Sequence, residues 1–104
     1  MDKIKHLRNS LIAAAGSAMR FKNVEDNGTC NFDTPIILLK DFTDVEIKKA
    51  FEGTPFQAYF NHDGSIEIFG VCSGIGFRRT TMAEAIRDSL KGNGYTAHVR
   101  YKMD

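Results

Sequence analysis

The sequence has 104 residues, of which 42% are hydrophobic and 26% are charged, and its 14 basic and 13 acidic residues give a net charge of +1. These values are typical of one folded domain and exclude intrinsic disorder and a strong overall field for nucleic acid or anionic membranes. Two cysteines, Cys30 and Cys72, are too few for a disulfide framework and lack the CxxC spacing of a zinc site. We therefore expect residues 1–104 to form a single cytoplasmic domain with reduced thiols. Residues 1–27 would form an N-terminal helix and loop, and residues 28–104 an α+β core.

The first predicted element is a helix that Asp2 caps and that ends near Phe21. Its apolar residues recur at helical spacing, at Ile4, Leu7, Leu11, Ala14, Ala18 and Phe21. The same segment also has the outline of a secretory signal peptide with cleavage after Ala15 or Ala18, but its apolar stretch is short and interrupted. No stretch approaches the roughly 20 apolar residues that span a bilayer. We expect this helix to dock on the rest of the domain.

The middle of the chain predicts a strand, a helix and a hairpin. Pro35–Leu39 is apolar on both alternating faces, which indicates a central strand covered on both sides. Thr43 and Glu46 have the spacing of a capping box, so a helix should occupy about 44–52. Alternating residues at 56–60 and 66–69 on either side of Asp63-Gly64 predict a β-hairpin.

The last part of the chain predicts a further helix and strand. Thr81 and Glu84 resemble a second capping box, which predicts a helix at about 81–91. Alternation from Tyr95 to Met103 predicts the last strand. After the N-terminal helix the order is therefore β-α-β-β-α-β. That order matches the ferredoxin-like two-layer sandwich, with a four-stranded antiparallel sheet in the strand order 4-1-3-2 and two helices on one face.

This topology brings three polar segments to one pole of the domain: residues 28–33, residues 72–81 and the C-terminus. In the middle segment a glycine-rich turn with two arginines leads into a helix whose first N–H groups need partners. Such a place favours phosphate or carboxylate. The predicted ligand-binding residues are Asn31, Asp33, Gly74, Gly76, Arg78, Arg79, Thr80 and Thr81.

A purely structural interpretation of the same residues competes with this one. The glycines would only form a turn, Asp33 would pair with Arg78 or Arg79, and the threonines would only cap the helix. The segment is neither a Walker loop nor a dinucleotide fingerprint. The sequence leaves both interpretations open.

The open face of the sheet offers another candidate site, for RNA. Tyr59 and Phe69 could stack on bases, and His98, Arg100 and Lys102 could hold phosphates. Three observations count against it: the first strand supplies no aromatic residue, the sequence has no Gly-aromatic stretch like those of RNA-recognition domains, and the apolar stripe of the first helix is expected to cover this face.

No catalytic residues, metal ligands or cofactor motif are predicted. Neither cysteine has a histidine nearby in the predicted fold that could form the reactive thiolate. The three histidines, His6, His62 and His98, are scattered over the predicted fold. An enzyme is therefore the least favoured class.

Four segments resemble an uncharacterised family of small proteins encoded in gut bacteria and their mobile elements. They are Gly28–Pro35, Arg78–Ala85, Gly94-Tyr95 and Tyr101–Asp104. The resemblance covers roughly residues 28–104 and implies no activity, but three of these four segments overlap the three polar segments that the predicted topology brings to one pole.

We therefore expect a non-enzymatic binding module that uses this pole for a phosphate-bearing or carboxylate-bearing ligand, such as a nucleotide. The alternative is a protein-interaction module, such as a phage or mobile-element factor that docks on a host protein. No membrane partner is expected.

Overall fold

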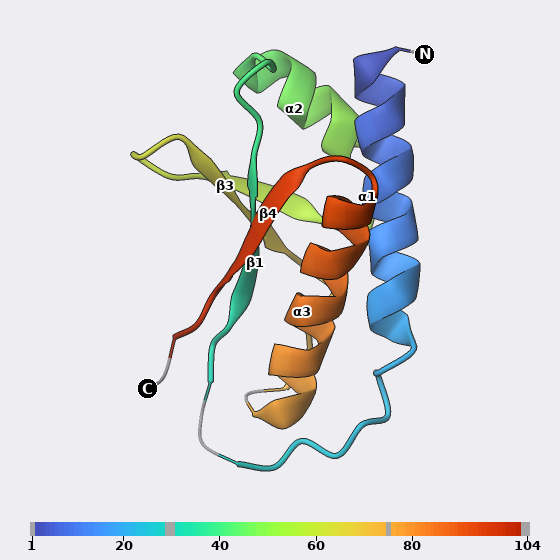
Figure 1. Cartoon of the computed structure of the whole chain (residues 1–104), viewed down its shortest axis with the longest axis vertical. Coiled ribbons are helices and arrows are strands. Elements are labelled where there is room, and N and C mark those ends of the chain that lie inside the picture. Colours follow the sequence, from blue (N-terminus) through green and yellow to red (C-terminus); the bar gives the residue numbers. More distant parts are fainter. Residues whose placement is uncertain (1, 29–30, 75, 103–104) are drawn as a thin grey trace.

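The computed structural model describes residues 2–28, 31–74 and 76–102, which form three helices and one open four-stranded antiparallel sheet (Figure 1). In chain order the elements are α1 (Lys3–Met19), β1 (Thr34–Leu38), α2 (Asp44–Phe51), β2 (Gln57–Phe60), β3 (Ser65–Phe69), α3 (Phe77–Gly92) and β4 (Thr96–Arg100). The predicted α+β class is confirmed. Within the described residues, no helix is both long enough and apolar enough to cross a membrane.

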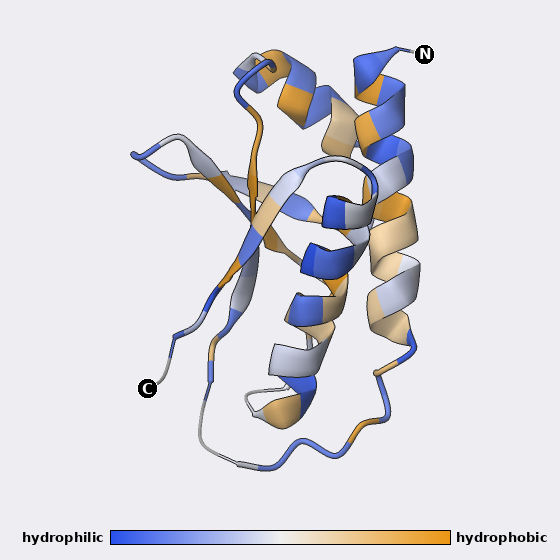
Figure 2. Cartoon of the chain, in the orientation of Figure 1, coloured by the Kyte–Doolittle hydropathy of each residue, from blue (hydrophilic) through white to orange (hydrophobic). Residues whose placement is uncertain are grey.

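The sheet has the strand order β2-β3-β1-β4, so β1 lies between two antiparallel neighbours. Ile36 stands opposite Glu67 of β3 and His98 of β4. The predicted central position of this strand is confirmed. Its side chains are buried on both faces, although helices cover only one of them: Ile37 is fully buried in the core, and Ile36, on the other face, is only 6% exposed. In Figure 2 the upper part of β1, towards α2, is hydrophobic, whereas its lower part is paler and more hydrophilic.

Local sequence signals set the boundaries of α2 and of the hairpin. The Thr43 hydroxyl accepts a hydrogen bond from the Glu46 N–H at 3.2 Å, and the Glu46 carboxylate accepts one from the Thr43 N–H at 2.8 Å. This is the predicted capping box. Between β2 and β3, Gly64 has a φ of 87°, which glycine adopts far more easily than other residues. The predicted hairpin is confirmed.

The first helix docks on the other helices. The Asp2 carboxylate caps it by accepting a hydrogen bond from the Ile4 N–H at 2.9 Å. α1 packs against α3 and α2, on the helical side of the sheet (Figure 1). The prediction that it covers the open face is wrong. An apolar stripe shows that a helix face is buried, but not which element buries it, and Leu7 and Leu11 are fully buried in the core that the helices share with one face of the sheet.

The start of α3 also differs from its prediction. The helix begins at Phe77, one turn earlier than expected, and its N-cap is Gly76. The capping box predicted at Thr81 and Glu84 is therefore wrong, because both residues lie inside the helix. The last strand, β4, ends at Arg100, and Met103 lies outside the described residues.

Candidate functional site

Hydrogen bonds join the three segments that were expected at one pole. The Phe32 N–H donates to the Lys102 carbonyl at 2.6 Å, and the Lys102 N–H donates to Oδ1 of Asp33 at 2.8 Å. The Thr80 hydroxyl, in the first turn of α3, donates to Oδ2 of Asp33 at 2.5 Å. The start of β1, the start of α3 and the chain after β4 therefore meet, as expected.

Asp33 is the centre of this junction and is only 2% exposed. Besides its two carboxylate contacts, its carbonyl accepts a hydrogen bond from Nε of Arg79 at 2.9 Å. Asn31 adds an amide donor to the Thr80 hydroxyl at 3.4 Å. Among the described residues no ion pair joins Asp33 to Arg78 or Arg79. Asp33 thus ties the pole together through Thr80 and backbone groups, rather than through the charge pair that the structural interpretation of the sequence expected.

The first N–H groups of α3 bind a carboxylate from the protein itself. Oδ1 of Asp26, in the loop after α1, accepts hydrogen bonds from the Gly76 N–H at 2.8 Å and from the Arg78 N–H at 3.3 Å. Gly74 has a φ of 84°, and a Cβ there would collide with the Asp26 carboxylate. Asp26 therefore occupies the position where the sequence suggested an external anion.

The remaining predicted residues have different surroundings. Arg78, Arg79, Thr80 and Thr81 belong to α3 itself and not to a loop before it. Thr81 is half-buried. Nε of Arg78 is buried and has no hydrogen-bond partner among the described residues.

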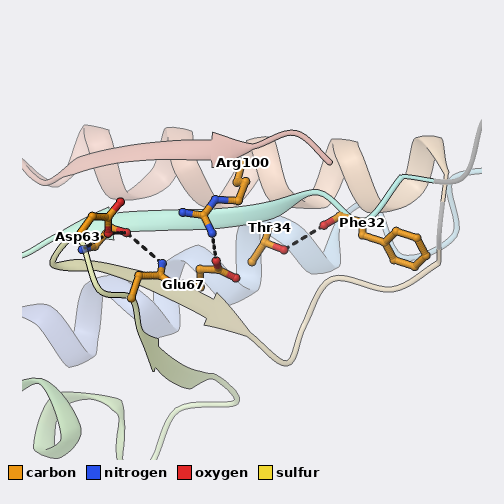
Figure 3. A network of polar contacts seen from close by, with 7 residues as sticks. Phe32, Thr34, Asp63, Glu67 and Arg100 are labelled. Atoms are coloured by element: carbon orange, nitrogen blue, oxygen red, sulfur yellow. Dashed lines mark hydrogen bonds and ion pairs between the residues drawn. The ribbon is translucent and has the colours of Figure 1, made fainter. Parts of the chain in front are cut away.

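Arg79 also lines a pocket of about 270 Å³ beside this pole. The strand residues in its lining belong to the sheet face opposite the core. The lining residues come from three strands, from α3, from the chain just before β1 and from the chain just after β4: Phe32, Thr34, Glu67, Phe69, Arg79, Arg100 and Lys102. Arg100 reaches across β1 and forms an ion pair with Glu67, as Figure 3 shows. The Thr34 hydroxyl donates to the Phe32 carbonyl at 3.1 Å.

The charges of this pocket are unbalanced. It contains three cationic side chains, Arg79, Arg100 and Lys102, and one carboxylate, Glu67. Two aromatic side chains, Phe32 and Phe69, complete the lining and are 39% and 36% exposed. The pocket is suited to an anion that also carries an apolar or aromatic part.

Sequence reasoning connected only part of this site. Arg79 was assigned to the pole and Arg100 to the open face, but nothing in the sequence placed the two together. Phe32 and Glu67 were missed. The alternation of β3 could have placed Glu67 on the same face as Phe69, whereas its pairing with Arg100 depends on the strand register.

The thiol of Cys72 is not arranged for nucleophilic chemistry. Cys72 is a free cysteine, and burial raises the pKa of its thiol to about 11, although the charge of Arg79 acts in the opposite direction. At neutral pH this thiol is therefore protonated and poorly reactive. Cys30 lies outside the described residues. Within the described parts of the chain, no three His, Cys, Asp or Glu side chains are grouped as metal ligands would be.

Comparisons with protein families, curated proteins and solved structures found no match. The resemblance to small proteins of gut bacteria and their mobile elements therefore rests on the quoted segments alone.

Proposed function

We propose that this protein is a non-enzymatic binding module for an anionic ligand, and that the ligand binds in the pocket between Arg79, Arg100 and Lys102. The observation that carries the proposal is the local excess of two positive charges in a concave site with aromatic walls. Guanidinium groups bind phosphate and carboxylate through paired N–H donors. The site shares Arg79 with the pole that the sequence indicated, but does not involve the N–H groups at the start of α3.

The hydrogen bonds of the pole hold the cationic groups in place. Arg79 is fixed through Nε, and its terminal nitrogens make no hydrogen bond to the described residues. The backbone of Lys102 is held on both sides, by Asp33 and by Phe32. The Tyr101 hydroxyl donates to Glu84 of α3 at 2.6 Å, which anchors the same segment once more. Groups held in this way lose less conformational freedom when a ligand binds.

For the fold, we propose a ferredoxin-like sandwich with an added N-terminal helix. The observed order β2-β3-β1-β4, read from the opposite edge, is 4-1-3-2, which supports this assignment. The cytoplasmic location stays a prediction.

An NMR titration of the isotope-labelled protein with pyrophosphate tests the proposed site. We expect the amide signals of residues 31–34, 67–69 and 100–102 to shift together and to saturate. Arg79→Ala should weaken binding by about tenfold or more, because hydrogen bonds that involve a charged group are worth about 1.5–3 kcal/mol.

Arg78→Ala is the matched control, since Arg78 is the sequence neighbour of Arg79 but does not line the pocket. Binding should remain within about twofold of wild type, in the absence of a direct contact. If pyrophosphate shifts none of these amides, the proposal is wrong. If Arg78→Ala weakens binding as much as Arg79→Ala does, the ligand lies elsewhere at the pole and the pocket is not the site.

A further inference from the structure

The face of the sheet opposite the helices is uncovered. Pairing registers place Tyr59 opposite Glu67 and Gln57 opposite Phe69, and Glu67 itself is opposite Ile36. These positions share one face because side chains alternate along a strand and paired residues lie on the same side. The core residues Ile37 and Ile66 belong to the other face. Since α1 packs on α2 and α3, the expectation that α1 covers this face no longer counts against a binding role for it.

Two aromatic side chains stand on this face next to the pocket. Tyr59 is 59% exposed and Phe69 is 36% exposed, and their rings meet edge to face with centroids 6.3 Å apart. Phe32, which also lines the pocket, is 39% exposed. A group of exposed aromatic residues beside cationic side chains is unusual on a surface that binds nothing.

The centre of the face, formed by β1, is less exposed than its two sides. Thr34 and Ile36 of β1 are only 5% and 6% exposed, although no helix covers them. Arg100 and Glu67 pair across β1 and shield this part of the strand (Figure 3). Aromatic surface is therefore available on the β2 and β3 side, while positive charge gathers on the β4 side and at the start of α3.

We propose that this face binds single-stranded nucleic acid. The phosphates would lie against Arg79, Arg100 and Lys102, and successive bases would stack on Phe69 and Tyr59. The inference rests on the proposed anion pocket and adds the class of ligand. Proteins that bind single strands commonly combine a cationic groove with aromatic platforms of this kind. A duplex does not fit, because its stacked bases cannot lie on the rings.

Fluorescence anisotropy with a labelled oligouridylate of about eight nucleotides tests the inference. Tyr59→Ala should weaken binding about fivefold or more, the lower end of the range for loss of one stacked base. Tyr59→Phe keeps the ring and should bind like wild type. The logarithm of the binding constant should fall with the logarithm of salt concentration with a slope of about −2, as expected for three phosphates that pair with the three cationic side chains.

Pyrophosphate binding, measured on the same variants, separates the inference from the proposed function. Tyr59 does not line the pocket, so Tyr59→Ala should leave pyrophosphate binding unchanged. If pyrophosphate binds but the oligonucleotide binds no more tightly, or if Tyr59→Ala has no effect on it, the nucleic-acid inference is wrong and the anion site stands. Equal binding of a duplex or of an oligoglutamate peptide, unaffected by Tyr59→Ala, would also overturn it. If neither pyrophosphate nor oligonucleotide binds, both proposals fail.

Discussion

Replacing Asp33 by alanine tests whether the pole is a structural junction. The carboxylate of this buried residue accepts hydrogen bonds from the Thr80 hydroxyl and the Lys102 N–H. Asp33→Ala removes both acceptor atoms and leaves the backbone carbonyl, which binds Arg79, in place. The substitution should therefore weaken the junction of β1 with α3 and with the C-terminal segment without changing the pocket charges directly.

The expected loss of stability follows from the two hydrogen bonds. A hydrogen bond to a charged group contributes about 1.5–3 kcal/mol. The Lys102 N–H is in an exposed segment where water can replace the carboxylate, so the Thr80 contact should dominate. We expect a total loss of about 2–4 kcal/mol in the free energy of unfolding. In a domain of this size that corresponds to a fall in Tm of about 10–30 °C.

Urea denaturation followed by circular dichroism measures this loss, with Asp33→Asn and Asp88→Ala as controls. Asp33→Asn keeps an acceptor for Lys102 and should lose about half as much stability. Asp88→Ala removes an exposed carboxylate paired with Arg87 and should change stability by about 0.5 kcal/mol or less. A double-mutant cycle with Thr80→Ala should give a coupling energy of about 0.5–3 kcal/mol. If Asp33→Ala costs no more than Asp88→Ala, our reasoning about the junction is refuted.

Three further predictions concern other parts of the domain. Burial raises the pKa of the Cys72 thiol to about 11, so this thiol should react slowly in the folded protein. In a Cys30→Ser variant at pH 8, iodoacetamide should modify the folded protein far more slowly than the urea-unfolded protein, and mass spectrometry measures both rates. Equal rates would contradict this prediction. The hydrogen bond from the Thr43 N–H, together with Lys3, holds the pKa of Glu46 below its ordinary value. The Glu46 carboxylate therefore stabilises α2 fully at pH values above the ordinary pKa of glutamate, and this contribution is lost as the pH falls through the lowered pKa. Thermal melts of wild type and Glu46→Gln should therefore differ at pH 7 and converge once the pH is well below the ordinary glutamate range. A difference that persists in acid would argue against the capping contribution. Gly16 lies in α1 with open space where a Cβ would be, so Gly16→Ala should raise the free energy of unfolding by about 0.5–1 kcal/mol in urea titrations, and a decrease would show an overlooked neighbour.

The accuracy of the sequence predictions depends on how far apart the interacting residues lie in the chain. The capping box of Thr43 and Glu46 and the Asp63-Gly64 turn are local signals, and both elements formed where expected. The start of α3 was misplaced because its partner, Asp26, lies 50 residues earlier than Gly76. No local pattern around residue 76 indicates such a partner.

The same limit applies to the candidate site. The predicted topology was sufficient to bring Asp33 and Thr80 to one pole, because it fixes the ends at which elements begin. The pocket required more, since the pairing of Arg100 with Glu67 across β1 depends on the exact register of three strands. Whether the sheet face opposite the core is exposed also depends on where α1 packs. The apolar stripe of α1 alone does not show on which element it packs.

Competition from the protein's own carboxylates explains why the pocket, and not the start of α3, is the better place for an external anion. Asp26 already accepts the N–H groups of Gly76 and Arg78, and a tethered group of this kind acts at an effective concentration in the millimolar range. An external anion must displace the Asp26 carboxylate to bind there, and the negative charge of the displaced carboxylate would then repel the bound anion. In the pocket the one carboxylate, Glu67, is already paired with Arg100, while the terminal nitrogens of Arg79 bind no described group. A phosphate can therefore enter the pocket without breaking a contact that holds the fold together.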